Sequence, residues 1–310
     1  MGSAGVRTGD LPIIRIYDRN RWEPVRNQIG SLPGLGDRRW VGAVMALAVL
    51  WVASGCSTLH HDERLHSTLW VQTSAEYVIS TKQVYAMATQ DLGAALRDPD
   101  WNAVLEQGDH GGDLPPAIIV DIDETILNNA GHAARAIIAR KGFVQEIWRA
   151  WVREKAAPAV PGAVDYLREA EAMGITVFYM SNRFRDLEEP TRKNLEAIGC
   201  PLREDIDVVM LREEQPGWGV DKSPRRAWVA ERFRVLQIVG DDLRDFVHVP
   251  EDDDDTARIE IALSHHDRWG EGWYMLPNPI YGGWEQALMK GEYAEHVSPL
   301  ERKFKSLQTH

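Results

Sequence analysis

The sequence has few cysteines and no apolar run of membrane-spanning length. Its 310 residues include only two cysteines, Cys56 and Cys200, which excludes a framework of several disulfides. Cys200 stands between a glycine and a proline, and an isolated cysteine of this kind is usually a small buried residue. The apolar run at residues 40–53 has 14 residues, fewer than the roughly 20 that a spanning helix needs.

Basic residues are also scarce relative to acidic ones. The chain has 35 Lys and Arg against 47 Asp and Glu, for a formal net charge of −12. Residues 1–55 carry a net charge of +3, so the remainder carries −15. Proteins that bind nucleic acid neutralise its phosphates with Lys and Arg, so the composition argues against nucleic acid as a partner. A phosphate bound here must be held by local cations and backbone dipoles.

The apolar run at residues 40–53 has the length of a secretory signal. It follows two arginines and ends in Ala53-Ser-Gly-Cys56, which resembles the lipobox of bacterial lipoproteins, although leucine is more usual than Ala53. We therefore expect Cys56 to carry a lipid anchor. Ser57 follows the cysteine where an aspartate would argue for the inner membrane, so we expect the outer membrane. An uncleaved anchor or a buried helix remains the alternative.

The body of the chain alternates between short apolar runs and helical patterns. Residues 65–97 predict one long helix, because their apolar positions are three and four apart. Residues 117–120, 175–180 and 235–239 are typical of buried parallel strands. Residues 161–173 predict a helix between the first two strands. This alternation predicts an α/β fold with a doubly wound parallel sheet, in which ligands bind beyond the carboxyl ends of the strands.

This pattern suggests five parts of the chain. We expect a leader and signal peptide at 1–55, an N-terminal helical segment and linker at 56–115, the α/β core at 116–127 and 159–295, a helical cap insertion at 128–158, and a C-terminal tail at 296–310. The cap follows the first predicted strand directly, so it is expected to lie near that strand's carboxyl end.

All three predicted strands end in residues that suit phosphate chemistry. Asp121 and Asp123 follow the first strand, Ser181 and Asn182 the second, and Asp241, Asp242 and Asp245 the third, while Lys222 opens a helix. Two carboxylates in different environments can serve as nucleophile and acid. A hydroxyl and an ammonium group can bind phosphate oxygens, and carboxylates suit a hard divalent cation. Each group alone is a weak signal, but together they form a coherent site.

These groups, in this order, resemble the four motifs of the haloacid dehalogenase superfamily of phosphotransferases. Three segments are similar to sequences of the class C acid phosphatases. They are Val-Asp-Ile-Asp-Glu-Thr-Ile-Leu-Asn-Asn, Phe-Tyr-Met-Ser-Asn-Arg and Val-Gly-Asp-Asp-Leu-Arg-Asp-Phe. That family includes lipoprotein 5′-nucleotidases of the outer membrane. The similarity runs from about residue 69 to about residue 289. It implies a haloacid dehalogenase-like core with a helical cap, and a phosphomonoesterase at the cell surface or in the periplasm.

The resemblance also implies roles for the strand-end residues. Asp121 would attack phosphorus and form an aspartyl-phosphate, and Asp123 would act as general acid and then general base. Mg²⁺ would be held by Asp121, the Asp123 carbonyl and Asp241. Ser181 and Lys222, with Asn182 beside them, would hold the phosphate oxygens. Because the family often has Gly-Asp-Asn where this chain has Gly-Asp-Asp, the contribution of Asp242 and Asp245 to metal binding stays open.

The leaving group would meet aromatic side chains. By the same resemblance, Phe143, Trp148 and Tyr281 match the family's substrate contacts, with core packing as the alternative for the tryptophan. Trp151 is expected in the core, because aromatic side chains mostly serve burial. Aromatic rings stack on bases of any kind, so nucleoside monophosphates and nicotinamide mononucleotide are the expected small-molecule partners. Whether the protein forms a homodimer is left open.

Two other functions remain as alternatives. One is a phosphotransferase or phosphonatase of the same superfamily. The other is a surface binding lipoprotein with an idle site, which the presence of all four motifs argues against.

Overall fold

The computed structural model describes residues 62–108, 112–290 and 298–309. The expected signal peptide and Cys56 lie outside these residues. No helix in the described ranges is both long and apolar enough to cross a membrane. Residues His60–His310 form one unit.

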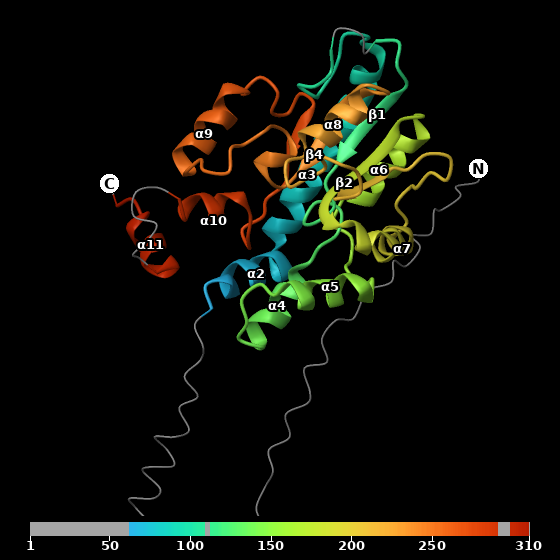
Figure 1. The fold of residues 1–310 in the computed structure, drawn as a ribbon. Helices are drawn as coiled ribbons and strands as arrows, with labels where there is room; N and C mark the ends of the chain where they lie inside the picture. Colours follow the sequence, from blue (N-terminus) through green and yellow to red (C-terminus); the bar gives the residue numbers. More distant parts are fainter. Residues whose placement is uncertain (1–61, 109–111, 291–297, 310) are drawn as a thin grey trace, which may run out of the picture. The chain divides into compact units, whose positions relative to one another are not determined.

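A five-stranded parallel sheet forms the centre of this unit (Figure 1). Its strands are β1 (Pro116–Val120), β2 (Thr176–Phe184), β3 (Val209–Arg212), β4 (Arg234–Gly240) and β5 (Trp273–Met275). They lie in the order β3-β2-β1-β4-β5, and every neighbouring pair is parallel. The chain thus starts in the middle of the sheet and builds outward on both sides. The predicted doubly wound α/β fold is confirmed.

The three predicted strands are β1, β2 and β4, whose residues are mostly buried. The sequence analysis missed both edge strands. β3 has four residues and β5 has three, so neither is long enough for a clear apolar pattern. Each forms by pairing with a longer strand: Val209 is in register with Tyr179, and Trp273 with Ile238.

Helices cover both faces of the sheet. Those between the first two strands and around the sheet are α2 (Arg64–Thr73), α3 (Ala75–Arg97), α4 (Ala130–Ile138), α5 (Gln145–Glu154), α6 (Ala163–Ala172), α7 (Glu188–Ile198), α8 (Ser223–Ala230), α9 (Asp255–Ser264), α10 (Gly283–Leu288) and α11 (Pro299–Lys305), with 3₁₀ turns η1 (Arg185–Leu187) and η2 (Leu243–Asp245). On one face, Gln237 of β4 accepts a hydrogen bond from Tyr166 of α6 and donates one to the Ala88 carbonyl of α3. On the other face, Phe178 of β2 packs edge-on against Trp228 of α8.

The predicted helix over residues 65–97 is two helices, and this expectation was wrong in its continuity. Ser74 separates α2 from α3, with extended backbone angles, and its side chain accepts a hydrogen bond from the Tyr77 amide at 3.1 Å. Serine is a favoured residue at a helix N-cap, because its oxygen satisfies an amide that has no partner within the helix. The break was missed because the apolar periodicity of the sequence continues across Ser74.

The segment at 128–158 contains α4 and α5. These helices lie beyond the carboxyl end of β1, with α4 next to α2 and α5 next to α7 (Figure 1). Asn129 begins α4 directly after the strand-end turn. The segment therefore borders the place where the predicted site residues leave the sheet.

Candidate active site

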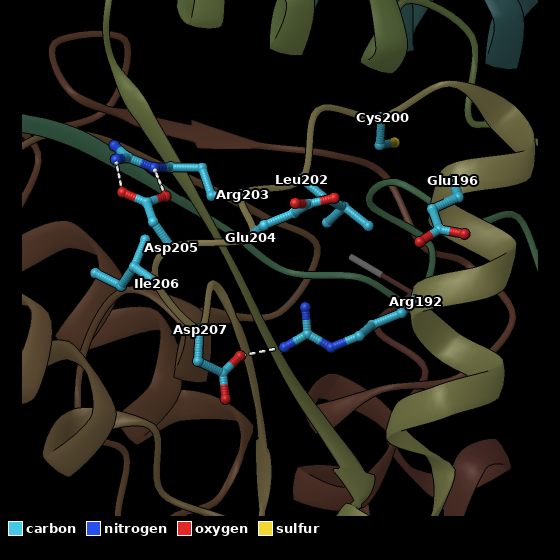
Figure 2. Close-up of a pocket in the computed structure, with 9 residues that line it drawn as sticks. All are labelled: Arg192, Glu196, Cys200, Leu202, Arg203, Glu204, Asp205, Ile206 and Asp207. Atoms are coloured by element: carbon cyan, nitrogen blue, oxygen red, sulfur yellow. Dashed lines mark hydrogen bonds and ion pairs between the residues drawn. The ribbon is translucent and has the colours of Figure 1, made fainter.

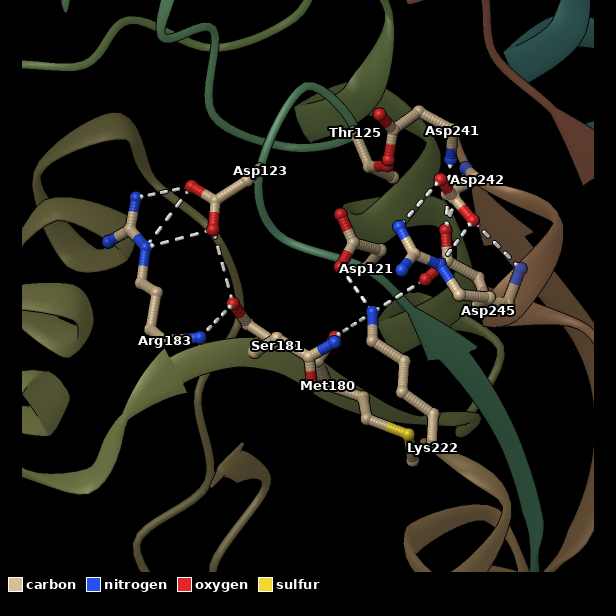
Figure 3. Close-up of polar contacts among 12 residues, drawn as sticks. Asp121, Asp123, Thr125, Met180, Ser181, Arg183, Lys222, Asp241, Asp242 and Asp245 are labelled. Atoms are coloured by element: carbon tan, nitrogen blue, oxygen red, sulfur yellow. Dashed lines mark hydrogen bonds and ion pairs between the residues drawn. The ribbon is translucent and has the colours of Figure 1, made fainter. Parts of the chain in front are cut away.

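Asp121 follows β1 directly and lies at the carboxyl edge of the sheet. Its amide donates to the Val239 carbonyl of β4 at 2.9 Å, which fixes the backbone between two strands. Its carboxylate is 7% exposed and pairs with Lys222 (Figure 3). Burial and the nearby carboxylates of Asp245 and Asp123 raise the pKa of Asp121 to about 7, although Lys222 opposes this shift.

Lys222 stands at the start of α8 and is buried. Its ammonium group pairs with Asp121 and Asp245, the latter at 2.6 Å, and donates to the Met180 carbonyl of β2 at 2.8 Å. Although burial opposes the charge, the two carboxylates raise the pKa of Lys222. Three elements of the fold thus place one permanent positive charge beside Asp121.

The three carboxylates after β4 have different surroundings. Asp245 binds Lys222 through Oδ1, while its Oδ2 accepts from the amides of Asp241 and Asp242 at 3.1 and 3.0 Å. A Cβ atom at Gly240 would collide with the Asp245 carboxylate, so glycine is required before these aspartates. Asp245 thereby orients Lys222 and shapes the turn.

Asp242 is held away from this centre. Its carboxylate binds Arg244 at 2.9 Å, Arg258 at 3.3 Å and the Gly283 amide at 2.5 Å. Although burial acts against it, the hydrogen bonds from Arg244 hold the pKa of Asp242 well below its usual range. This side chain links η2, α9 and the start of α10.

Asp241 faces the site and could share a metal ion with Asp121. Carboxylate oxygens of Asp121, Asp241 and Asp245 lie within 4.8 Å of one another. Asp241 Oδ2 accepts from Asn278 at 2.7 Å, and Thr125 Oγ1 lies 3.5 Å from Oδ1. Burial and the neighbouring carboxylates raise the pKa of Asp241 well above its ordinary value. Buried carboxylates of this kind are hard oxygen ligands that a divalent cation would stabilise, so this acidic cluster fits a metal site.

Asp123 lies across the site, on the side of β2. Its carboxylate pairs with Arg183 at 2.7 Å and accepts from the Ser181 hydroxyl at 3.1 Å (Figure 3). Asn129 also donates to it, at 2.9 Å. The guanidinium of Arg183 also donates to Thr191 of α7 at 3.0 Å, so it is fixed at both ends.

Glu124 is a buried acid that the sequence analysis did not single out. It has a positive φ of 61°, accepts from the Asn129 amide at 2.7 Å, and binds the hydroxyl of Tyr281. Burial and Asp123 raise the pKa of Glu124 to about 8, against the hydrogen bonds from Tyr281 and Asn129. The Tyr281 ring is 39% exposed, so its hydroxyl is anchored while its ring remains accessible.

The predicted substrate aromatics border Asp123 from two directions. Phe143 is 67% exposed, and its ring centroid lies 6.5 Å from that of Trp148. Trp148 in turn lies against Arg183, whose guanidinium carbon is 5.6 Å from the ring centroid. Tyr281 reaches the same region through Glu124. Trp151 is buried in the core, as expected.

The side chain of Asn182 is not directed at these carboxylates. Its oxygen accepts from Arg225 at 2.5 Å, and its nitrogen donates to the Val220 carbonyl at 3.0 Å. Arg225 is fully buried and also binds the Ser181 carbonyl at 2.6 Å. Asn182 and Arg225 together fix the backbone that presents Ser181.

A second group of charges lies at the opposite edge of the sheet. Figure 2 shows a pocket of about 690 Å³ that includes Arg192, Cys200, Arg203 and Asp207. Arg203 donates to Thr176, the first residue of β2, so the pocket lies at the amino ends of the strands. Both arginines are paired with carboxylates inside the pocket. The pocket therefore offers no spare cation for a phosphate, unlike the edge that carries Asp121.

Several residues of the site escaped the sequence analysis, although they stand within the quoted motifs. These are Glu124, Asn129 and Arg183, with Arg225 and Asn278 nearby. Buried charged groups need partners, and a charged residue inside an apolar strand end was the available signal for Arg183. Its partner could not be read from the sequence, because Asp123 is 60 residues away.

Comparisons with known proteins agree with this geometry. Residues 50–284 match the family model for the HAD superfamily, subfamily IIIB (acid phosphatase). Two structures of the class C acid phosphatase from Bacillus anthracis, one with tungstate bound, are 29% and 28% identical to this chain. Each has a TM-score of 0.68 and covers 80% of this chain and 98% of its own.

A curated relative, Acid phosphatase 1 of Solanum lycopersicum, is 26% identical over 181 residues. That match covers 57% of this chain and 62% of the tomato protein, so the chain spans less than two thirds of its length. The strand-end aspartates, the buried lysine and the match over residues 50–284 lead to one assignment. The chain belongs to subfamily IIIB, the acid phosphatases, of the HAD superfamily.

Proposed function

We propose that this protein is a metal-dependent phosphomonoesterase, an acid phosphatase that acts through an aspartyl-phosphate. The observation that carries the proposal is the buried carboxylate of Asp121 beside Lys222, with Asp241 within ligand distance and Asp123 across the site. Family membership and the Bacillus anthracis structures support it.

The reaction would proceed in two steps at Asp121. In the first, a carboxylate oxygen of Asp121 attacks phosphorus, the bond from phosphorus to the leaving oxygen breaks, and Asp123 gives that oxygen a proton. In the second, Asp123 takes a proton from water, the water oxygen attacks phosphorus, and the bond to Asp121 breaks. General acid–base transfer of this kind typically contributes about 10²–10⁴-fold.

The charges needed for this chemistry come from few groups. Lys222 and the Ser181 hydroxyl would bind phosphate oxygens. Mg²⁺ would be held by Asp121, Asp241 and the Asp123 carbonyl; when bound, it offsets the repulsion between the attacking carboxylate and the phosphate dianion. Both Asp245 oxygens are engaged by Lys222 and backbone amides, so Asp245 orients the lysine.

Nucleoside monophosphates and nicotinamide mononucleotide are the proposed substrates. Phe143 and Tyr281 are exposed, and Trp148 lies against both Phe143 and Arg183, which binds Asp123. Flat rings favour flat leaving groups and tolerate differences in their edge groups. The Bacillus anthracis enzyme was observed with tungstate, and an oxyanion of that shape suits the proposed phosphate position here.

A steady-state assay tests the activity. The purified protein should release inorganic phosphate from nucleoside monophosphates, a chelator should abolish release, and added Mg²⁺ should restore it. Transfer of phosphate to an added alcohol, with little free phosphate formed, would instead favour the phosphotransferase. Binding of substrate without any turnover in the presence of Mg²⁺ would favour the binding lipoprotein.

We further propose that Cys56 anchors the protein to the outer membrane. The basic flank, apolar run and terminal cysteine support this location. The native protein should be recovered with the outer membrane, whereas Cys56→Ala should be recovered in soluble form. Identical partitioning of the two proteins would rule out acylation at this residue.

A further inference from the structure

Asn129 occupies the N-cap of α4 but does not cap that helix. Asparagine is favoured at this position because its side-chain oxygen accepts a hydrogen bond from a helix amide. Here the preceding residue, Asn128, accepts from the Ala130 amide at 2.9 Å. The side chain of Asn129, a residue that is only 2% exposed, therefore binds groups other than the helix amides.

The Asn129 side chain connects the two acids after β1. Its Nδ2 donates to Asp123 Oδ1 at 2.9 Å and to Glu124 Oε2 at 3.2 Å. Its backbone amide donates to the other oxygen of Glu124 at 2.7 Å. Arg183 and Ser181 also hold Asp123, and Arg183 shares Oδ1 with Asn129. Asn129 supplies the contact that comes from the start of α4.

Trp151 of α5 determines which way the Asn129 amide points. The indole nitrogen of Trp151 donates to Asn129 Oδ1 at 2.8 Å. An indole N–H can only donate, whereas an amide offers an oxygen at one end and an NH₂ at the other. The oxygen of Asn129 must therefore face Trp151, and its NH₂ must face Asp123.

The position of Trp151 depends in turn on how α4 and α5 pack. A Cβ atom at Gly131 would lie 2.9 Å from Trp151 Cη2, so only glycine leaves room for the ring. Arg135 of α4 lies over the same ring at 4.9 Å. The indole is thus seated against α4, one turn from Asn129.

We infer that Asn129 is a positioning residue, through which Trp151 of α5 aims the Asp123 carboxyl at the leaving-group oxygen. This inference rests on the proposed role of Asp123 as proton donor. Without the indole N–H, the oxygen of Asn129 loses its donor, and the amide is held only through its NH₂, which Asp123 shares with Glu124 and the Leu127 carbonyl. The contact with Asp123 is then less well directed. Arg183 would then draw Asp123 towards β2 and away from the leaving group.

Leaving-group dependence provides the test, because only poor leaving groups need the proton. Trp151→Phe keeps a buried ring and removes the N–H, and Asn129→Asp keeps the acceptor for Trp151 while removing the donor to Asp123. Each variant should lower kcat/KM for phenyl phosphate by about 10-fold, yet change kcat/KM for 2,4-dinitrophenyl phosphate by less than about twofold. The ratio kcat/KM is used because it reports the step that expels the phenol and not the later hydrolysis, in which Asp123 acts as base for both substrates. Trp151→Phe also covers the case in which Asn129→Asp fails to fold.

Trp269→Phe is the matched control. Its indole nitrogen donates to the Ala262 carbonyl at 2.9 Å, in a part of the fold that holds no proposed site residue. It should cause a similar loss of thermal stability and leave the ratio of the two kcat/KM values unchanged. A merely structural role of Trp151 would give the same result as this control and would overturn the inference.

Asp123→Asn separates the inference from the proposed function. If it lowers kcat/KM for both aryl phosphates equally, the role of Asp123 as proton donor is wrong and the inference falls with it. If Asp123→Asn selectively slows phenyl phosphate but Trp151→Phe does not, only the inference is wrong. In the Asp123→Asn background, Trp151→Phe should have no further selective effect, because its proposed target is absent.

Discussion

The chain carries two clusters of three carboxylates, and they differ in what surrounds them. Asp121, Asp241 and Asp245 lie at the carboxyl edge of the sheet, whereas Glu188, Asp207 and Glu214 lie beside the edge strand β3. Each cluster contains a carboxyl whose pKa burial and neighbouring carboxylates raise to about 7, Asp121 in one and Glu214 in the other. A perturbed pKa and an acidic triad therefore do not identify the site by themselves.

The basic residue and its exposure distinguish the two clusters. Lys222 is buried beside Asp121 and receives support from β2 and Asp245. Arg192 bridges Glu188 and Asp207, and Asp207 is more than half exposed. Water screens the charges of a partly exposed ion pair, whereas the charge of a buried group is screened less and so interacts more strongly with a bound phosphate. The geometry around the carboxylates, more than their number, makes the first cluster suitable for catalysis.

The sharpest test of this comparison removes one carboxylate from each cluster. Asp121→Asn should lower kcat by about 10³-fold or more, because an amide cannot form the acyl phosphate. Asp207→Asn should leave kcat within about twofold, as is usual for surface substitutions. Steady-state assays on both purified variants, with circular dichroism to verify folding, decide the matter. Substantial turnover by Asp121→Asn would contradict its assignment as nucleophile.

Metal binding should separate the clusters next. Substitution of residues that only orient metal ligands typically costs about 10–100-fold in affinity, so Asp241→Asn should weaken Mg²⁺ binding by at least that factor. Glu214→Gln, the matched change in the other cluster, should leave the affinity for Mg²⁺ unchanged. Isothermal titration calorimetry on metal-free protein measures both. Equal weakening by the two substitutions would show that the second cluster also binds the metal.

The pH dependence of stability gives a smaller effect with a defined sign. The pKa of Asp121 is raised to about 7 in the folded protein, against about 4 in an unfolded chain. Between these values the folded metal-free protein holds a proton that the unfolded chain has released. Its free energy of unfolding should therefore fall as the pH rises from about 5 to about 7.

Mg²⁺ should reverse that trend, because it binds the ionised carboxylate and its affinity rises with pH. Denaturant titrations with chelator and with Mg²⁺, at several pH values, measure the slopes. Asp121→Asn should flatten the metal-free slope and remove the stabilisation by Mg²⁺. Glu214→Gln should flatten the metal-free slope as well, yet leave stabilisation by Mg²⁺ intact. Loss of that stabilisation in Glu214→Gln would erase the distinction between the clusters.

The smallest effect is expected at Cys200, which borders the pocket at the amino edge. Burial raises the pKa of its thiol to about 12, so little thiolate exists near neutral pH. Cys200→Ala should retain activity within about twofold, and the native thiol should react with a disulfide reagent only after unfolding. Rapid modification with loss of activity would show that this edge is coupled to the site.

The sequence by itself determined the fold class and the set of chemically important residues. The three inner strands were readable because buried parallel strands are continuous apolar runs, and Asp121, Ser181, Lys222 and Asp241 stood at their ends or at a helix start. Burial of Cys200 and Trp151 was predicted and is confirmed. These features depend on local composition and on short-range spacing, which a single chain displays directly.

Only the tertiary structure decided which partners each of these side chains binds. It placed Asp241 in the acidic cluster with Asp121, turned Asp242 towards Arg244, and paired Asp245 with Lys222, although all three follow the same strand. It also paired Asp123 with Arg183 and joined it to Trp151 through Asn129. Neighbouring side chains differ in direction according to the local turn, and their partners are brought from distant parts of the chain. Sequence spacing records neither, because both depend on how strands and helices pack in three dimensions.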